Sequence, residues 1–292
     1  MKVTVLGCGN AFSNVNFNQC FMLEECGRTM LIDYGYQAPA ALHRAGISVN
    51  DINDIYISHL HGDHIGGLEQ MAFLRYDWMK RPTNWRNRAS SSVAPCLIAN
   101  ERVLADLWDK SLRGGLESME GFDANLETFF EPHPVRGNET FMWQGWHCQL
   151  IQQIHIMTGT IISPSFGLFM SKDDQHIYFT ADSQHCSPKQ VEVFYQRATT
   201  IFQDCECLGV NTATKSMVFS SGVHANFAQL AGWTSANSHI LPDSIKQKMY
   251  LSHYQDFVNS DKDFFGNECA WDALAAGSGL KEFVRVGNVF NF

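Results

Sequence analysis

Residues 56–69, YISHLHGDHIGGLE, place three histidines and an aspartate within six positions, namely His59, His61, Asp63 and His64. Crowded polar side chains are costly to bury without partners, so a purely structural role in a hydrophobic core is unfavourable. Imidazole and carboxylate groups are common zinc ligands, and an aspartate can also bridge two cations. The stretch therefore predicts a metal site. Six positions cannot complete two metal shells, so further ligands must come from elsewhere in the chain.

The neighbouring sequence suggests how the fold presents this cluster. DINDIYISH, residues 51–59, is a predicted strand that delivers the first histidine at its end, and LEQMAFLRYDWMK, residues 68–80, is a predicted helix. Gly62, Gly66 and Gly67 are expected to let the backbone bend between the two elements. Strands that come first and helices that are interleaved later indicate a layered α/β or α+β fold.

Other segments predict local structure. Residues 20–35 indicate two strands joined at Cys26-Gly27, and residues 168–179 indicate a hairpin that turns at 172–175. ETFFEP, residues 127–132, is a predicted strand, whereas residues 187–198 and 224–233 are predicted helices.

Candidates for the missing ligands follow three strand-like runs. His155 follows LIQQI, Asp182 follows HIYFTA, and His253 follows KMYLS. We expect these side chains, which come at the carboxyl ends of strands, to gather on one edge of a sheet sandwich with the first cluster.

These motifs also resemble a known family. SHLHGDHIGG resembles the HxHxDH signature of the metallo-β-lactamase fold, and His155, FTADS and LSHY match its later ligand motifs in order. The match extends from VTVLGCGNAFS through LIDYG to residue 253. It implies an α/β fold, an αββα sandwich of two mixed β-sheets flanked by helices. We expect residues 1–292 to form a single domain with an insertion at about 76–130.

The resemblance assigns two divalent metal ions, zinc in the first place, with manganese and iron as alternatives. It implies that one ion is held by His59, His61 and His155, the other by Asp63, His64 and His253, and that Asp182 bridges them. Two such ions bind a shared hydroxide that attacks the substrate. Asp33 in LIDYG is expected to orient the metal loop, and Asn10 and Phe12 in GCGNAFS are expected to line the site.

IFQDCE, SGVHANFAQLAGW and MYLSHY are similar to motifs of the tRNase Z-like phosphodiesterase branch. On this match His224 is a general acid that assists phosphodiester cleavage, and Asp204 is the carboxylate that holds it. Asp63 completes the predicted catalytic residues. The chain departs from the branch at Gln203, where the branch has a histidine, and in the long spacing between His224 and His253.

The substrate is expected to be small. The tRNA-processing enzymes of the branch use a long basic arm between the third histidine and the bridging aspartate, but here only 26 residues separate His155 from Asp182. The net charge of -9 also disfavours binding to long nucleic acids. Compact members resemble cyclic-nucleotide phosphodiesterases, among them phage anti-Pycsar proteins that destroy cyclic CMP and UMP signals. Arginines and aromatic residues in 75–88 are a candidate nucleotide-binding surface, with a solvated loop as the alternative.

We therefore predict a metal-dependent hydrolase, a dinuclear phosphodiesterase that acts on a cyclic nucleotide. Two alternatives are enzymes: a carboxylic hydrolase of the same fold, such as a lactonase or thioesterase, and a tRNase Z-like endonuclease. A third is a non-enzymatic protein that captures a nucleotide. We expect a homodimer, no membrane segment, and a cytoplasmic location (the host cytoplasm if a phage encodes the chain), since scattered cysteines are typical of free thiols in a reducing compartment.

Overall fold

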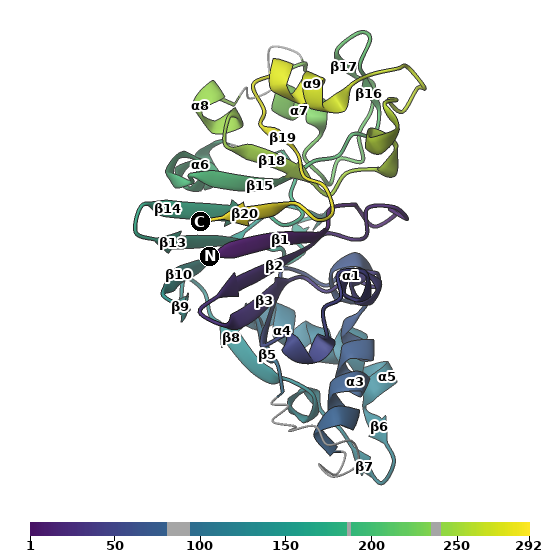
Figure 1. Ribbon diagram of the computed structural model, residues 1–292, viewed down its shortest axis with the longest axis vertical. Helices are drawn as coiled ribbons and strands as arrows, with labels where there is room; N and C mark the ends of the chain where they lie inside the picture. Colours follow the sequence, from purple (N-terminus) through teal and green to yellow (C-terminus); the bar gives the residue numbers. More distant parts are fainter. Residues whose placement is uncertain (81–93, 186–187, 235–240) are drawn as a thin grey trace. The chain divides into compact units, whose positions relative to one another are not determined.

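A computed structural model describes residues 1–80, 94–185, 188–234 and 241–292, and all their side chains except those of 77–80 and 188–191. The chain divides into two compact units. Unit 1 comprises residues 1–7, 17–137 and 287–292, and unit 2 comprises residues 8–16 and 138–286. Each unit contains one seven-stranded sheet (Figure 1).

The sheet of unit 1 has the order β20-β1-β2-β3-β4-β5-β8. Its first three pairs are antiparallel and its last three are parallel. The strands are β1 (Lys2–Gly7), β2 (Cys20–Glu25), β3 (Arg28–Ile32), β4 (Asp54–Ile57), β5 (Cys96–Asn100), β8 (Glu131–Val135) and β20 (Val289–Asn291). The strand predicted at 127–132 is therefore wrong in its bounds, because a 3-10 turn at Leu126–Thr128 comes first.

The helices of unit 1 follow the expected apolar spacing. In α1 (Ala38–Arg44), Ala38, Ala41 and Leu42 are buried at positions i, i+3 and i+4, and the helix packs against β1. The predicted helix at 68–80 is confirmed as α3. The other elements are α2 (Gly62–Ile65), α3 (Leu68–Lys80), α4 (Glu101–Leu107), a π-helical turn (Trp108–Leu112), α5 (Arg113–Leu116), a 3-10 turn (Val49–Asp51) and the short strands β6 (Ser118–Met119) and β7 (Phe122–Asp123).

The sheet of unit 2 has the order β19-β18-β15-β14-β13-β10-β9. Read from β9, its first three pairs are antiparallel and its last three are parallel. The strands are β9 (Thr140–Trp143), β10 (Trp146–Gln152), β13 (Phe166–Lys172), β14 (Gln175–Phe179), β15 (Thr200–Asp204), β18 (Met249–Ser252) and β19 (Glu282–Phe283).

Short elements connect the strands of unit 2. α6 packs against β14, α9 against β19 and α7 against β17. These elements are α6 (Pro188–Arg197), α7 (Phe227–Ala231), α8 (Asp243–Lys246), α9 (Trp271–Gly277), a 3-10 helix (Asp256–Ser260), and the two-stranded pairs β11 (Met157–Thr158) with β12 (Ile161–Ile162) and β16 (Val210–Asn211) with β17 (Ser216–Met217).

Both predicted hairpins are confirmed. β2 and β3 are joined through Cys26 (φ 49°) and Gly27 (φ 76°), and β13 and β14 through Asp173 (φ 50°). Within the predicted insertion, β5 pairs with β4 and β8 in the main sheet, and residues 81–93 lie outside the described part of the chain. The expected single domain with an insertion stays a prediction.

A buried carboxylate organises the loop that precedes α9 in unit 2. Asp263 is 3% exposed and accepts hydrogen bonds from the main-chain N–H groups of Thr212, Phe265 and Asn267 at 2.9 Å each. Burial alone raises its pKa, but these hydrogen bonds to the carboxylate lower the pKa more, so that it lies below its ordinary value.

Asp263→Ala should therefore reduce the free energy of unfolding by about 1–3 kcal/mol at neutral pH, because buried N–H donors lose their acceptor. Because the carboxyl pKa is lower in the folded state, the ionised side chain stabilises the fold at pH values above its unfolded-state pKa of about 4. This contribution is lost as the pH falls through the folded-state pKa. Thermal unfolding at pH 7, 5 and 3.5 should show the two proteins converging toward low pH. A constant difference would contradict this account.

Candidate metal centre

In unit 1 the predicted cluster lies where β4 ends and α2 begins. His59 and His64 are buried and Asp63 is 5% exposed, whereas His61 is half-buried. The Nε2 atom of His59 lies 3.0 Å from Nδ1 of His61, and Nε2 of His64 lies 3.3 Å from a carboxylate oxygen of Asp63. Four nitrogen- and oxygen-bearing side chains therefore meet in one turn, as the sequence predicted.

Asp33 fixes this turn from the end of β3. Its carboxylate accepts hydrogen bonds from the main-chain N–H and the hydroxyl of Ser58, each at 2.8 Å, and lies 2.7 Å from Nδ1 of His64. The expected orienting role of Asp33 is thus supported by its contacts. Because Nδ1 of His64 is held by the carboxylate, Nε2 is the atom that can bind a metal ion. Ser58, which the sequence analysis missed, directly precedes His59 and lies 3.0 Å from its Nδ1.

Two glycines of the turn, Gly66 and Gly67, are packed so closely against neighbouring main-chain atoms that no larger residue fits. A Cβ atom at Gly66 would lie 2.5 Å from the Gly62 carbonyl oxygen, and one at Gly67 would lie 2.6 Å from that of Gly35. Such distances leave no room for a side chain. A Cβ atom on Gly62 would meet its nearest neighbour at 3.9 Å, so the predicted need for a glycine at that position is not evident.

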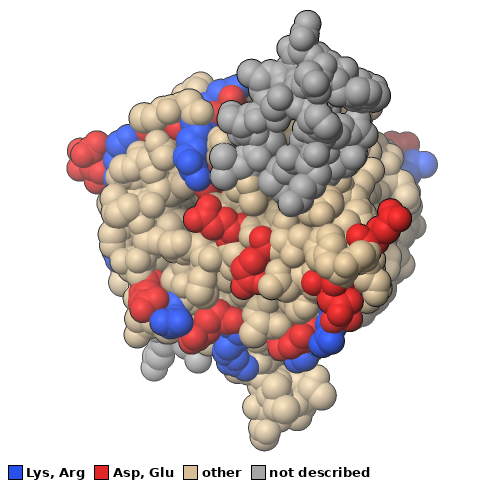
Figure 2. Space-filling model, turned by 90° about the horizontal axis from the view of Figure 1, so that it is seen from below, with Lys and Arg blue, Asp and Glu red and all other residues tan. Residues whose placement is uncertain are grey.

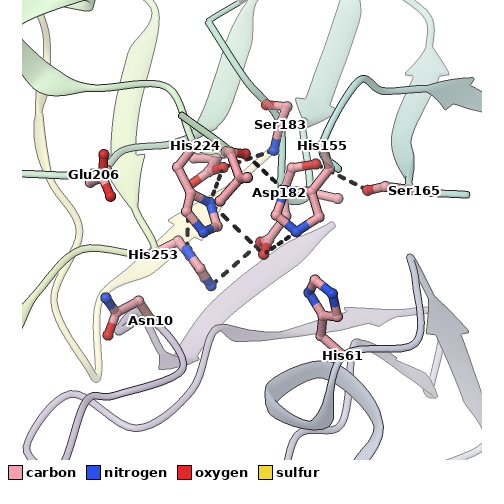
Figure 3. A network of polar contacts seen from close by, with 12 residues as sticks. Asn10, His61, His155, Ser165, Asp182, Ser183, Glu206, His224 and His253 are labelled. Carbon is pink, nitrogen blue, oxygen red and sulfur yellow. Dashed lines mark hydrogen bonds and ion pairs between the residues drawn. The ribbon is translucent and has the colours of Figure 1, made fainter. Parts of the chain in front are cut away.

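In unit 2, Asp182 lies between two imidazoles (Figure 3). One carboxylate oxygen is 3.6 Å from Nε2 of His155, and the other is 3.4 Å from Nε2 of His253. Zinc binds such atoms at about 2.0–2.2 Å, so two ligands of one tetrahedral ion lie about 3.4 Å apart. The spacing is therefore that of ligands of a metal ion, which agrees with the predicted role of Asp182 as a ligand.

The other nitrogen of each imidazole is already engaged within unit 2. Nδ1 of His155 lies 2.8 Å from the carbonyl oxygen of Val223, and Nδ1 of His253 lies 3.3 Å from Asp204. The hydrogen bond to Val223 places a hydrogen on Nδ1 of His155 and leaves its Nε2 lone pair for a metal ion, and the nearby Asp204 carboxylate favours the same tautomer of His253. Burial lowers the pKa of His155 and Asp182 opposes this effect, so the ring is in the neutral form that a metal ligand requires.

His224 and Asp204 form a hydrogen-bonded pair, with Nδ1 of His224 2.9 Å from the Asp204 carboxylate. The same Nδ1 is 3.9 Å from Asp182, which places the imidazole beside the metal ligands. Burial by itself lowers the pKa of His224, but the Asp204 charge and hydrogen bond offset this effect and raise the pKa above its ordinary value. Burial likewise raises the pKa of Asp204, while the contacts with His224 lower it overall. Both shifts favour the protonated imidazole, which is the form from which a general acid donates.

His224 does not open a helix, contrary to the sequence prediction. α7 begins after Asn226, whose side chain accepts the N–H of Ala228 and forms a capping box with Gln229. His224 lies two residues before this cap, in a loop. At the departure from the branch, the Gln203 amide accepts from the Tyr195 hydroxyl and donates to the Asp204 carbonyl, so its contacts are structural.

Three residues with left-handed backbone conformation lie at the strand ends of these sets: Asp33 (φ 62°), Ala181 (φ 54°) and His253 (φ 63°). Non-glycine residues with positive φ are uncommon, and such strain clusters at functional sites. At His253 the strained backbone is held by a hydrogen bond of 2.7 Å from its N–H to the Cys8 carbonyl.

The loop of residues 8–16 lies next to His253, because the N–H of Asn10 donates to the carbonyl oxygen of Tyr254 at 3.3 Å, and the expected place of Asn10 in the site stays a prediction. The Asn10 side chain accepts the N–H of Phe12 at 3.0 Å and thereby shapes its own turn. Asp256 accepts hydrogen bonds from the Ser13 hydroxyl and from the main-chain N–H groups of residues 14–16. Phe12 is 86% exposed on this ordered loop, so its predicted place in the site stays a prediction.

Arg75 does not belong to the candidate nucleotide-binding surface predicted at residues 75–88. Arg75 is 3% exposed, and its guanidinium donates to the carbonyl oxygens of Val49 and Ile52 at 2.8 and 2.9 Å, so it is a structural residue. Tyr76 contacts the rings of Phe122 and Phe129. The other predicted members lie outside the described residues or have side chains that the structure does not describe.

Comparison with known proteins decides the family. Residues 1–269 match the family model of the anti-Pycsar protein Apyc1. The chain belongs to the anti-Pycsar Apyc1 family. A protein named Apyc1 from Paenibacillus sp. (strain J14) is 29% identical over 269 residues, which are 91% of this chain and 94% of that protein. Another from Bacillus phage vB_BsuM-Goe3 is 26% identical over 276 residues, with 91% and 92% coverage.

Solved structures confirm the predicted fold. The metallo-β-lactamase fold protein YhfI of Bacillus subtilis superposes with a TM-score of 0.68 at 14% identity and 99% coverage of each chain. Zinc-bound PqqB from Methylobacterium extorquens gives 0.68 at 10% identity, with 100% coverage of each chain. The short form of human tRNase Z gives 0.64 at 14% identity and covers 100% of this chain and 99% of that one.

The Apyc1 family, the metallo-β-lactamase fold and the histidine and aspartate sets together support a metal-dependent hydrolase with divalent metal ions, as the sequence predicted. Among the described helices, none is long and apolar enough to cross a membrane.

Asp182→Ala should remove most of the bound transition metal, because both imidazoles of unit 2 would lose the carboxylate that completes their ion sites. Elemental analysis of purified protein measures the metal per chain. Asp174→Ala, in the exposed hairpin turn of the same unit, is the matched control and should keep the wild-type content. Equal metal content in the two variants would contradict the bridging role.

Proposed function

We propose that this chain is a dinuclear metal-dependent phosphodiesterase that hydrolyses a small cyclic nucleotide of the cyclic CMP or cyclic UMP type. The observation that carries the proposal is the His224–Asp204 pair next to Asp182, because a leaving sugar alkoxide needs a proton and an imidazole held by a carboxylate is suited to donate one. Membership of a family named for anti-Pycsar proteins supports the choice of a cyclic nucleotide.

In this proposal the two sets of ligands act together. One ion is held by His59, His61 and His155, the other by Asp63, His64 and His253, and Asp182 contributes to both. Zinc is the proposed metal. When bound, the ions would activate water and stabilise the negative charge on the phosphate oxygens.

The chain's own groups supply orientation and proton transfer. Asp33 and the Val223 carbonyl hold His64 and His155 through Nδ1, so that both imidazoles present Nε2. Asp204 binds His224 through Nδ1 and favours the charged imidazole, in which Nε2 also carries a hydrogen that could pass to the leaving oxygen. The His224 side chain is 18% exposed, which gives a substrate access to it.

A small substrate agrees with the structure between His155 and Asp182, where β11 to β14 form two hairpins and leave no long arm among these residues. On the face shown in Figure 2, acidic and basic side chains are interspersed over the coloured surface. Long nucleic acids require a continuous basic surface, and the coloured part of this face offers none. The expected homodimer stays part of the proposal and can be measured by light scattering.

The test is product analysis with 3′,5′-cyclic and 2′,3′-cyclic nucleotides, a thioester, a lactone and a short RNA, each with and without a chelator. We expect hydrolysis of a cyclic nucleotide to a nucleoside monophosphate, and its loss on chelation. Turnover of the thioester or lactone instead would favour a carboxylic hydrolase, and cleavage of the RNA would favour an endonuclease. Binding of a cyclic nucleotide without turnover would indicate a capture protein.

His224→Ala should lower the turnover of a cyclic nucleotide by roughly 10²-fold or more, because the leaving alkoxide loses its proton donor. Bis-p-nitrophenyl phosphate, whose leaving group needs little protonation, should be affected less. Metal content should be unchanged. His147→Ala, which alters an exposed histidine on β10, is the control and should retain full activity. Equal losses with both substrates would argue against a general acid.

A further inference from the structure

The segment of residues 221–225 supports two separate parts of the proposed site in unit 2. The carbonyl oxygen of Val223 accepts a hydrogen bond from Nδ1 of His155 at 2.8 Å. Nδ1 of His224 is hydrogen-bonded to the Asp204 carboxylate at 2.9 Å. One short segment therefore determines both which nitrogen His155 offers to a metal ion and where His224 stands. What holds the segment in place thus affects both groups.

Glu206 binds this segment at both ends. At one end, the Glu206 N–H donates to the Ala225 carbonyl at 2.7 Å, and the Glu206 carbonyl accepts from the N–H of Phe227 at 2.7 Å. At the other end, the Glu206 carboxylate accepts the N–H of Ser221, with distances of 3.3 and 3.0 Å to its two oxygens. Val223 and His224 lie between these two attachments.

Ser221 continues the connection toward the metal ligand. Its hydroxyl accepts the N–H of Val223 at 3.3 Å, while the intervening Gly222 has a φ of 78°. That positive φ favours glycine and allows the tight turn. A continuous series of hydrogen bonds thus runs from the Glu206 carboxylate through Ser221 and Val223 to Nδ1 of His155.

The burial of Glu206 is the unusual feature. It is 2% exposed, and among the described residues its side-chain hydrogen bonds come from the single main-chain N–H of Ser221. Burying a carboxylate carries a large desolvation cost, and a neutral side chain would fill the same space. Asp204 and Glu206 are two positions apart, so on an extended chain their side chains share one side, toward the 221–225 segment.

We propose that Glu206 is a positioning residue of the metal centre, which fixes the Val223 carbonyl through Ser221 and so sets the ring orientation and tautomer of His155. The hydrogen bonds of Glu206 to this segment also keep the His224 imidazole in contact with the Asp204 carboxylate. The inference rests on the proposed metal centre and adds a residue that contacts neither metal nor substrate. Outer partners of metal-binding histidines typically change metal affinity by about 10–100-fold when they are removed.

The experiment compares Glu206→Ala, Glu206→Gln and Ser221→Ala with the wild-type protein. Zinc affinity is measured by competition with a chromogenic chelator, and the visible spectrum of the cobalt-loaded protein reports the ligand geometry. Thermal unfolding of the metal-free protein reports stability. Asp263→Ala is the matched control, since Asp263 is also a buried carboxylate of unit 2 that accepts main-chain N–H groups. Ser220→Ala is the control for Ser221→Ala.

We expect Glu206→Ala to weaken zinc binding by at least about tenfold and to alter the cobalt spectrum. Glu206→Gln keeps an oxygen acceptor and should recover part of the affinity. Ser221→Ala should weaken zinc binding relative to Ser220→Ala. Asp263→Ala should lower the unfolding temperature with wild-type zinc affinity and spectrum.

Wild-type zinc affinity and spectrum in Glu206→Ala would overturn the inference, as would an equal loss of affinity in Asp263→Ala. If Glu206→Ala does not fold, the decision rests on the two milder variants, and wild-type metal binding in both Glu206→Gln and Ser221→Ala overturns the inference. A wild-type protein that binds no transition metal contradicts the proposed function itself. The two failures are therefore distinguishable.

Discussion

The placement of one carboxylate between two imidazoles is the constraint on which the proposed chemistry depends. The oxygens of Asp182 lie 3.6 Å from Nε2 of His155 and 3.4 Å from Nε2 of His253, which is too far for good hydrogen bonds and suitable for ions between them. On the other side of the rings, Nδ1 of His155 is hydrogen-bonded to the Val223 carbonyl and Nδ1 of His253 faces the Asp204 carboxylate. A metal ion that arrives thus meets ligand atoms already in place, and little reorganisation is needed.

The two sheets have the same pattern of strand pairing. Each has three antiparallel pairs followed by three parallel pairs. In unit 1, Asp33 and His59 follow β3 and β4, and in unit 2, Asp182 and His253 follow β14 and β18. The carboxyl ends of parallel strands share one edge of a sheet, which is where ligands bind in many α/β proteins. The left-handed residues at these ends turn the chain immediately, so that the side chains remain at the edge.

The sequence predicted the elements whose signals are local. Apolar spacing identified α3, turn residues identified both hairpins, and the close spacing of His59, His61, Asp63 and His64 identified the first ligand set. The contacts that orient these ligands were less accessible. Val223 acts through its main-chain carbonyl, which any residue provides, and Arg75 is buried by main-chain oxygens that no side-chain pattern reveals. The bounds of β8 were misplaced because the capping box of Asn125 and Thr128 forms a 3-10 turn first.

The loop of residues 8–16 shows a different use of a carboxylate, that of the half-buried Asp256. Asp256 binds four successive residues of this loop, three positions along the chain from His253. With its backbone fixed in this way, the loop presents the nearly fully exposed ring of Phe12 in one direction. A molecule that rests on this ring would not have to immobilise the loop, so it would lose little conformational entropy on binding.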